Sequence, residues 1–113
     1  MNWVDLQDRL LPAKNWIIQN QLLDGSIPWD EKGKCDAWDH SECLISLAIY
    51  AEWDAFEKGI DWFFNNLNSQ GLIYSEFNNQ QPTQLNYQSH HAPYIALPPV
   101  SYTHLTLPTI VRV

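Results

Sequence analysis

An ungapped internal repeat constrains the fold more than any other feature of this sequence. The segment WIIQNQLLDGSIPW, residues 16–29, aligns with WFFNNLNSQGLIYS, residues 62–75, at a constant separation of 46 positions. The matched pairs include Trp16 with Trp62, Gly25 with Gly71, and Ile27 with Ile73. A unit of this length is longer than a tetratricopeptide or ankyrin repeat and is long enough for a helical hairpin.

Capping and breaking signals predict three helices. Pro12 suits the first position of a helix and Gly25 provides a stop, which predicts a helix from Pro12 to about Leu23. An acidic residue followed three positions later by Glu is typical of a capping box. Two such pairs open predicted helices at about 40–52 and 55–67, namely Asp39 with Glu42 and Asp54 with Glu57.

The predicted helices differ in how much apolar surface they carry. Residues 40–52 are apolar on almost every face, whereas residues 55–67 keep one polar face. A helix that is apolar all round is buried. Buried inner helices and amphipathic outer helices would therefore alternate along the chain. We predict an all-α fold built from two concentric layers of helices.

Residues of the first repeat resemble a known sequence pattern. Ala13, Trp16, Ile17, Gln21 and Gly25 resemble the Q-W repeat of squalene and hopene cyclases. The second copy contributes the start of the same pattern, with Lys58, Gly59, Trp62 and Phe63. The stretches DGSIPW and DAWDHSE are also similar to bacterial prenyltransferase-like proteins, relatives of the terpenoid cyclases and of protein prenyltransferase β subunits.

The resemblance implies an α/α toroid, of which this chain would supply two hairpins of outer and inner helices and leave the ring incomplete. It also implies an isoprenoid or similar apolar substrate in a central helical cavity. The chain departs from the Q-W pattern at four positions: Pro12 replaces the basic residue, Leu67 replaces Gln, and Ile27 and Ile73 stand where Trp is expected.

The C-terminal segment has a different origin in our interpretation. VSYTHLTLPT, residues 100–109, resembles the translation of a transposase-type sequencing adapter, and residues 110–113 fit the index and stop codon that would follow it. We expect residues 1–98 to be the N-terminal fragment of a toroid domain and residues 99–113 to be a non-native tail, extended or disordered. The alternative is a natural C-terminal strand. A fragment of this kind should have weak or no activity.

Composition excludes several classes of partner. The net charge is −7, with 6 Lys and Arg against 13 Asp and Glu, which disfavours nucleic acid as a partner. No run approaches the ~20 apolar residues of a transmembrane helix, and the first residues lack the basic start of a secretory signal. Two cysteines are more typical of reduced thiols than of a disulfide framework. We therefore expect a cytoplasmic protein without an integral membrane segment.

The loop before the second predicted helix carries the candidate catalytic residues, Asp36, His40 and Glu42. In the toroid that the resemblance implies, inner helices begin at the rim of the cavity, and a histidine there suits acid–base chemistry. Asn86, Ser89 and His90 follow Asp36, Asp39 and His40 by 50 positions each, so His90 and His91 become candidate substrate-binding residues at the same rim. Helix capping alone also accounts for Asp39 and Glu42, and either histidine could simply pack in the fold.

Aromatic and metal-binding residue types complete the candidates. Trp29 and Trp38, in the same loop, are candidate substrate-binding residues, since indole faces attract cations and stack on sugars. Trp16 and Trp62 recur at the repeat period, which favours packing. The set Cys35, Asp36, His40 and Cys43 contains zinc-ligand types without paired C-x-x-C spacing, so we predict no metal site and identify no cofactor.

Three functions remain open at this point. The first is a prenyltransferase-like or terpenoid-cyclase-like enzyme, although the chain contains neither D-x-D-D nor D-D-x-x-D. The second is a carbohydrate-active α/α-barrel glycosidase or lyase, which requires paired carboxylates and exposed Trp platforms. The third is a non-catalytic helical scaffold. In the first two cases the partner is a small-molecule substrate, an isoprenoid or a sugar.

Overall fold

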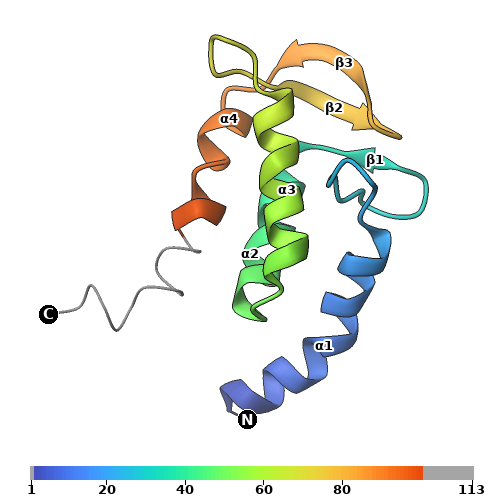
Figure 1. The fold of residues 1–113 in the computed structure, drawn as a ribbon, viewed down its shortest axis with the longest axis vertical. Helices are drawn as coiled ribbons and strands as arrows, with labels where there is room; N and C mark the ends of the chain where they lie inside the picture. Colours follow the sequence, from blue (N-terminus) through green and yellow to red (C-terminus); the bar gives the residue numbers. More distant parts are fainter. Residues whose placement is uncertain (1, 101–113) are drawn as a thin grey trace, which may run out of the picture.

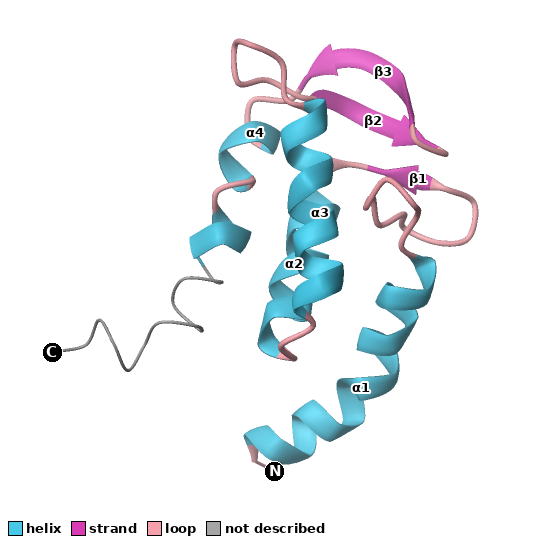
Figure 2. Ribbon diagram, viewed as in Figure 1, coloured by secondary structure: helices cyan, strands magenta, loops and turns pink. Residues whose placement is uncertain are grey.

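The computed structural model describes residues 2–100 and combines helices with a small antiparallel sheet (Figures 1 and 2). The elements, in chain order, are α1 (Trp3–Asn20), β1 (Lys34–Cys35), α2 (Ala37–Ile49), α3 (Trp53–Asn66), β2 (Tyr74–Asn78), β3 (Gln81–Tyr87) and α4 (His91–Tyr94). Of the predicted adapter-derived tail, residues 99–113, the structure describes only Pro99 and Val100, which are helical rather than extended; residues 101–113 lie outside the described residues.

The predicted all-α partial toroid is wrong, because three of these elements are strands. They form one antiparallel sheet in the order β1-β2-β3, in which Cys35 pairs with Phe77 and Asn78 pairs with Gln81. The sheet lies across the end of the α2–α3 pair where α2 begins and α3 ends, with α1 and α4 on opposite sides of that pair (Figure 1). The fold is therefore a mixed α and β structure.

The hairpin between β2 and β3 turns at Asn79 and Gln80. These residues have φ of 48° and 73°, and two consecutive positive φ values are what the common two-residue hairpin turn requires. Asn tolerates this conformation better than most residues. β2 alternates between buried and half-buried positions, whereas β3 is exposed along its whole length. After β3 the chain forms only the short helix α4.

The structure confirms the 46-residue repeat at the level of backbone geometry. α1 ends at Asn20 and α3 at Asn66, and each is followed by a glycine with positive φ, Gly25 at 93° and Gly71 at 76°. The same two hydrogen bonds close both turns: Leu22 N–H to Ser26 O at 2.8 Å and Gly25 N–H to Leu22 O at 3.0 Å, matched by Asn68 N–H to Leu72 O at 2.9 Å and Gly71 N–H to Asn68 O at 3.0 Å. The chain thus builds the same helix-to-turn unit twice.

All three predicted helix starts are displaced. α3 begins at Trp53 rather than at about residue 55, and Asp54 lies in its first turn instead of capping it, since Glu52 is the N-cap and its side chain makes no capping hydrogen bond. Pro12 lies inside α1, which begins after Asn2, whose side chain accepts a hydrogen bond from Asp5 N–H at 2.9 Å. α1 bends partway along its length (Figure 1), as expected when proline removes a backbone donor and crowds the preceding turn. α2 begins three residues earlier than predicted, since Asp36 rather than Asp39 is its N-cap.

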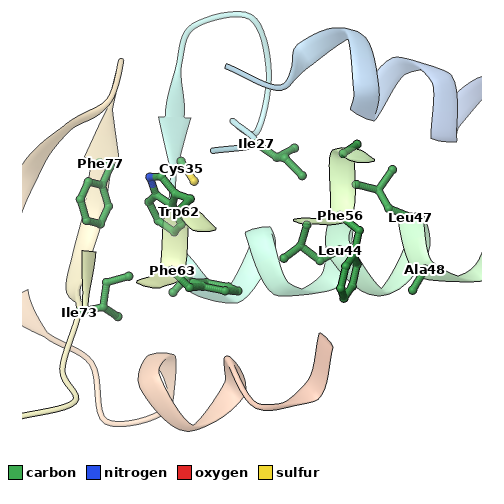
Figure 3. Close-up of a cluster of buried hydrophobic side chains, with 12 residues drawn as sticks. Ile27, Cys35, Leu44, Leu47, Ala48, Phe56, Trp62, Phe63, Ile73 and Phe77 are labelled. Carbon is green, nitrogen blue, oxygen red and sulfur yellow. The ribbon is translucent and has the colours of Figure 1, made fainter. Parts of the chain in front are cut away.

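The core lies between α2, α3 and the sheet (Figure 3). Its buried side chains are Ile27, Cys35, Ala37, Leu44, Leu47, Ala48, Ala55, Phe56, Trp62, Phe63, Ile73 and Phe77. Gly59 allows α2 and α3 to approach closely, because a Cβ at this position would lie 2.2 Å from Leu44 Cδ2. The tryptophans of the repeat differ: Trp62 is 1% exposed and packs as predicted, whereas Trp16 on α1 is 45% exposed.

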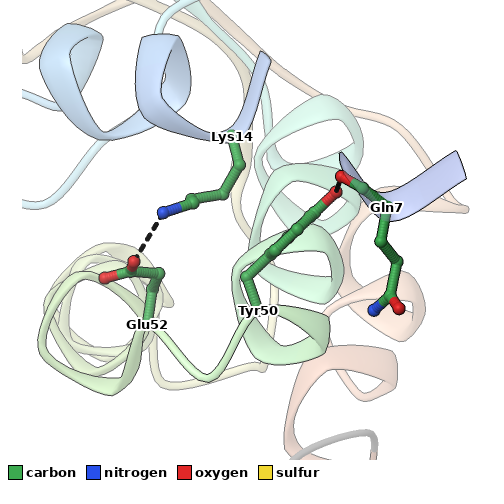
Figure 4. Close-up of polar contacts among 4 residues, drawn as sticks. All are labelled: Gln7, Lys14, Tyr50 and Glu52. Carbon is green, nitrogen blue, oxygen red and sulfur yellow. Dashed lines mark hydrogen bonds and ion pairs between the residues drawn. The ribbon is translucent and has the colours of Figure 1, made fainter. Parts of the chain in front are cut away.

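Polar contacts join α1 to the connection between α2 and α3 (Figure 4). Lys14 Nζ lies 2.7 Å from Glu52 Oε1 in an ion pair that is largely shielded on the lysine side, and the Tyr50 hydroxyl donates to Gln7 O at 2.7 Å. Lys14 also lies over the Tyr50 ring, 5.7 Å from its centroid. Across residues 2–100, no helix has both the length and the apolar character needed to cross a bilayer.

Candidate ligand-binding site

A pocket of about 430 Å³ is lined by residues of β2, β3 and the N-terminal ends of α2 and α4. Three segments of the chain meet there: the stretch from Trp29 through β1 into the first turn of α2, the β2–β3 hairpin, and the residues that lead into α4. The lining residues are Trp29, Asp36, Trp38, Ser75, Glu76, Gln84, Asn86, Gln88, His90 and His91. The pocket therefore brings together five of the seven residues that the sequence pointed to.

Two half-exposed indole rings give the pocket its aromatic surface. Trp29 is 45% exposed and Trp38 is 43% exposed. The Trp38 ring meets the His90 ring edge-on, with centroids 5.0 Å apart, and lies 6.0 Å from the Tyr94 ring. The ammonium of Lys34 lies over Trp29, 5.7 Å from the ring centroid. Both indoles thus remain available to a ligand on part of their surface.

Asp36 combines a structural role with a place in the pocket. Its Oδ1 accepts a hydrogen bond from Asp39 N–H at 2.7 Å, which caps α2. Burial raises the pKa of the Asp36 carboxyl, and the nearby charge of Glu76 raises it further. Burial and the charge of Asp36 likewise raise the pKa of Asp39. The pocket is therefore lined by two carboxyl groups, Asp36 and Glu76, and burial more than the charge of Glu76 makes ionisation of Asp36 costly.

The β2–β3 hairpin adds polar side chains that the sequence analysis did not select. Ser75 Oγ donates to Asn86 Oδ1 at 2.8 Å, which orients the Asn86 amide. Thr83 Oγ1 lies 3.2 Å from Glu76 Oε2. Gln84 and Gln88 supply two further amides. Residues 75–89 are rich in Asn, Gln and Ser, and this composition was the sequence feature that could have identified them as pocket residues. It indicates a shared polar surface only when the segment is known to form a sheet.

The two adjacent histidines lie in different surroundings. Their rings are in contact, with centroids 4.6 Å apart and planes at 79°. His90 is exposed, whereas His91 is 5% exposed, and no group in residues 2–100 forms a hydrogen bond with His91 Nδ1. Burial lowers the pKa of His91, as does the neighbouring His90. A buried nitrogen without a partner costs stability.

The remaining predicted catalytic residues, His40 and Glu42, do not line this pocket. His40 is fully buried, with Nδ1 accepting from Ile27 N–H at 3.1 Å and Nε2 donating to Gly59 O at 2.9 Å. Burial lowers its pKa to about 4, so the imidazole is a neutral structural link between three segments. Glu42 is exposed on α2 and lies 3.4 Å from the Tyr94 hydroxyl. The predicted recurrence of His40 at His90 therefore does not place the two histidines in one site.

The cysteines and acids do not assemble into a metal centre in the part of the chain described. No group of three or more His, Cys, Asp or Glu side chains there is arranged to hold a metal ion. Cys35 and Cys43 are free thiols, and burial raises both pKa values, that of Cys43 to about 11. Thiols of this kind are protonated and unreactive at neutral pH.

The pocket is thus an open concavity in which polar side chains and aromatic rings both line the surface. Carboxylates and amides can accept or donate hydrogen bonds to a ligand rich in hydroxyl or amino groups, and the indoles can cover its apolar faces. No protein-family model matches the chain, and no curated protein matches it.

Proposed function

We propose that the chain carries a carbohydrate-binding site and derives from a carbohydrate-active enzyme, a glycosidase or a lyase. The observation that carries this proposal is the presence of two half-exposed tryptophans, Trp29 and Trp38, in one pocket with two carboxyl groups, Asp36 and Glu76. Indole rings stack on the apolar faces of sugar rings, and carboxylates and amides bond to their hydroxyl groups. Glycoside hydrolysis further uses a pair of carboxyl groups, one of which has a raised pKa.

The test is a titration of the full chain with neutral and charged mono- and oligosaccharides, followed by NMR of the tryptophan indole N–H signals. The Trp29→Ala variant should lose binding. Trp16→Ala is the matched control, because Trp16 has the same exposed fraction of 45% but lies on α1, away from the pocket. The proposal fails if no sugar shifts the indole signals, or if both variants weaken binding equally.

An enzyme that acts on an isoprenoid, as in the terpenoid-cyclase and prenyltransferase-like families, is the second candidate. It is supported by the contacts of two residues of the Q-W pattern. Gln21 Nε2 donates to Gly25 O at 3.0 Å and to Ala55 O at 2.9 Å, so it ties the first repeat to α3. A Cβ on Gly25 would lie 2.0 Å from Lys58 O, so this glycine permits close contact there. Binding of geranyl diphosphate in the same titration, with no response to sugars, would favour this candidate.

A scaffold without a ligand is the third candidate, and it predicts no response to either class of compound. We also propose a cytoplasmic location, which the two free cysteines support, and no nucleic-acid partner, which the net charge of −7 supports.

A further inference from the structure

We propose that the sugar ligand of this pocket is a linear, neutral oligosaccharide that lies along β3 and stacks on both indole rings. This inference rests on the carbohydrate-binding proposal and adds the length and the charge of the ligand. It draws on three observations: two separate aromatic platforms, a row of amide side chains along β3, and the size and lining of the pocket.

The pocket offers two stacking platforms that belong to different segments of the chain. Trp29 precedes β1, whereas Trp38 lies in the first turn of α2, and each indole is half-exposed. The His90 ring meets the Trp38 ring edge-on, with centroids 5.0 Å apart, and this contact restricts the rotation of the indole. A single sugar ring covers one indole face. Two platforms in one pocket therefore suit a ligand of more than one ring.

A row of amide side chains follows the exposed strand. Gln84, Asn86 and Gln88 are spaced two residues apart, and all three line the pocket. β3 is exposed at every position, so the protein leaves this row open to a ligand. The first and last amides are four residues apart, which corresponds to roughly 13 Å of extended chain. That distance exceeds the width of one sugar ring, so an oligosaccharide can contact the whole row.

The irregular pairing of β2 with β3 helps to bring these side chains to one pocket. The register shifts on both sides of Glu76, and each shift places an extra residue on β3, which curves along its length (Figure 2). Bulges of this kind bend a strand and redirect side chains beside binding sites. Ser75 Oγ donates to Asn86 Oδ1 at 2.8 Å, so the amide oxygen is satisfied and the Asn86 N–H groups can donate to a hydroxyl group of the ligand. The row is therefore pre-organised at its centre.

The size and the lining of the pocket restrict the ligand further. Its volume of about 430 Å³ lies within the range of pockets that hold drug-sized ligands, which are larger than a monosaccharide. Among the described residues that line it there is no Lys or Arg, whereas two carboxyl groups, those of Asp36 and Glu76, are present. A uronate or a sulfated sugar would add negative charge beside these carboxyl groups without meeting a base. A neutral sugar avoids this repulsion.

The experiment titrates the full chain with linear β-1,4-linked sugars of glucose, xylose and N-acetylglucosamine, each as mono-, di- and tetrasaccharide. The indole N–H signals are the readout. In at least one series the tetrasaccharide should bind about ten-fold more tightly than the monosaccharide, the gain expected for one or two further hydrogen bonds. This gain exceeds the statistical advantage of four equivalent rings. The tetrasaccharide should shift both pocket indole signals, and tetragalacturonate, a charged chain of the same length, should bind more weakly.

Two substitutions and a matched control test the row of amides. Gln84→Ala and Gln88→Ala should each weaken binding of the tetrasaccharide by about three- to ten-fold, the loss expected for one hydrogen bond, and so reduce its advantage over the monosaccharide. Gln81 is the control, because it is an exposed amide of the same strand that does not line the pocket. Gln81→Ala should leave binding of both sugars unchanged.

The outcomes separate this inference from the carbohydrate-binding proposal. If no mono- or oligosaccharide binds, both are overturned. If monosaccharides bind as tightly as tetrasaccharides, if tetragalacturonate binds as tightly as the neutral chains, or if Gln81→Ala weakens binding as much as Gln88→Ala, this inference is overturned and carbohydrate binding stands. Affinity that rises with the number of rings and falls in Gln84→Ala and Gln88→Ala supports both.

Discussion

Acidification should destabilise this protein through a single buried histidine, His40. Its Nδ1 accepts from Ile27 N–H and its Nε2 donates to Gly59 O, so both ring nitrogens are satisfied only in the neutral form. Adding a proton to Nδ1 would set two N–H groups against each other in the core. Burial accordingly lowers the pKa of His40 from 6.5 to about 4.

The size of the effect follows from the difference between the pKa of His40 in the unfolded chain and its pKa in the folded chain. The unfolded chain binds a proton at His40 below about pH 6.5, whereas the folded chain does not until about pH 4. Between these values the unfolded state holds more protons, so the free energy of unfolding falls as the pH falls. A shift of roughly 2.5 pKa units corresponds to about 3 kcal/mol lost between pH 7 and pH 4. That loss is a large fraction of the stability of a small domain.

The assay is urea denaturation followed by tryptophan fluorescence at several pH values between 7 and 4.5. The His40→Gln variant should be less stable at pH 7, because it loses the ring contacts with Trp62 and Phe63, but its stability should depend less on pH. The raised pKa values of Asp36 and Asp39 act in the opposite direction and cancel in the difference between the two proteins. Leu47→Ala is the control, since it destabilises the core without changing a titrating group.

Parallel stability curves for the wild-type chain and His40→Gln would refute this reasoning. So would a wild-type chain that gains stability, relative to the variant, as the pH falls. The Leu47→Ala curve should run below that of the wild-type chain and parallel to it.

Three further substitutions test the packing and capping seen in the structure. Gly59→Ala places a Cβ against Leu44 and should cost about 1–3 kcal/mol, measured by urea denaturation. Asp36→Ala should cost about 1 kcal/mol and lower the helical circular dichroism signal, whereas Asp39→Ala should cost less than half of that; the reverse order would contradict the assignment of the N-cap. Lys14→Met removes the ion pair of Figure 4 and should lower the free energy of unfolding by about 1 kcal/mol. Because salt screens this ion pair in the wild-type chain, the cost of the substitution should be smaller in 1 M NaCl.

The helix-to-turn unit was the most predictable part of the fold. Gly25 and Gly71 recur at the repeat period, and a glycine after a helix commonly adopts the positive φ that ends it. The apolar pattern of residues 40–52 predicted a helix buried on all sides, but α2 is buried on one side only, through residues such as Leu44 and Leu47, while Ile49 is 41% exposed. The turns depend on local backbone preferences, which a single sequence displays directly.

The start of α2 was not predictable from its pattern. The stretch DAWDHSE contains two overlapping capping registers, one beginning at Asp36 and the other at Asp39. Either acid satisfies the first-turn N–H groups equally well. The register beginning at Asp36 is the one that buries Ala37 and His40 against the core, so tertiary packing makes the choice. It also turns His40 from a candidate catalytic residue into a structural one.

The sheet was missed because its outer strand has no apolar alternation. β3 consists largely of polar residues and is exposed at every position, so nothing in its pattern distinguishes it from a loop. It forms because the turn at Asn79 and Gln80 brings it against β2, whose alternate side chains reach the core.

The sequence by itself determined the repeat, the helix-ending turns and the acidic charge of the chain, since the first and last are read directly from the residues and the turns follow from local backbone preferences. The tertiary structure alone decided that Glu76 and Gln84 join Trp29, Trp38 and Asp36 in one pocket. The physical reason is that this pocket depends on the pairing of strands that are distant in sequence, such as β1 and β2. The burial of a few apolar residues such as Phe77 sets this pairing, whereas the polar residues that line the pocket do not.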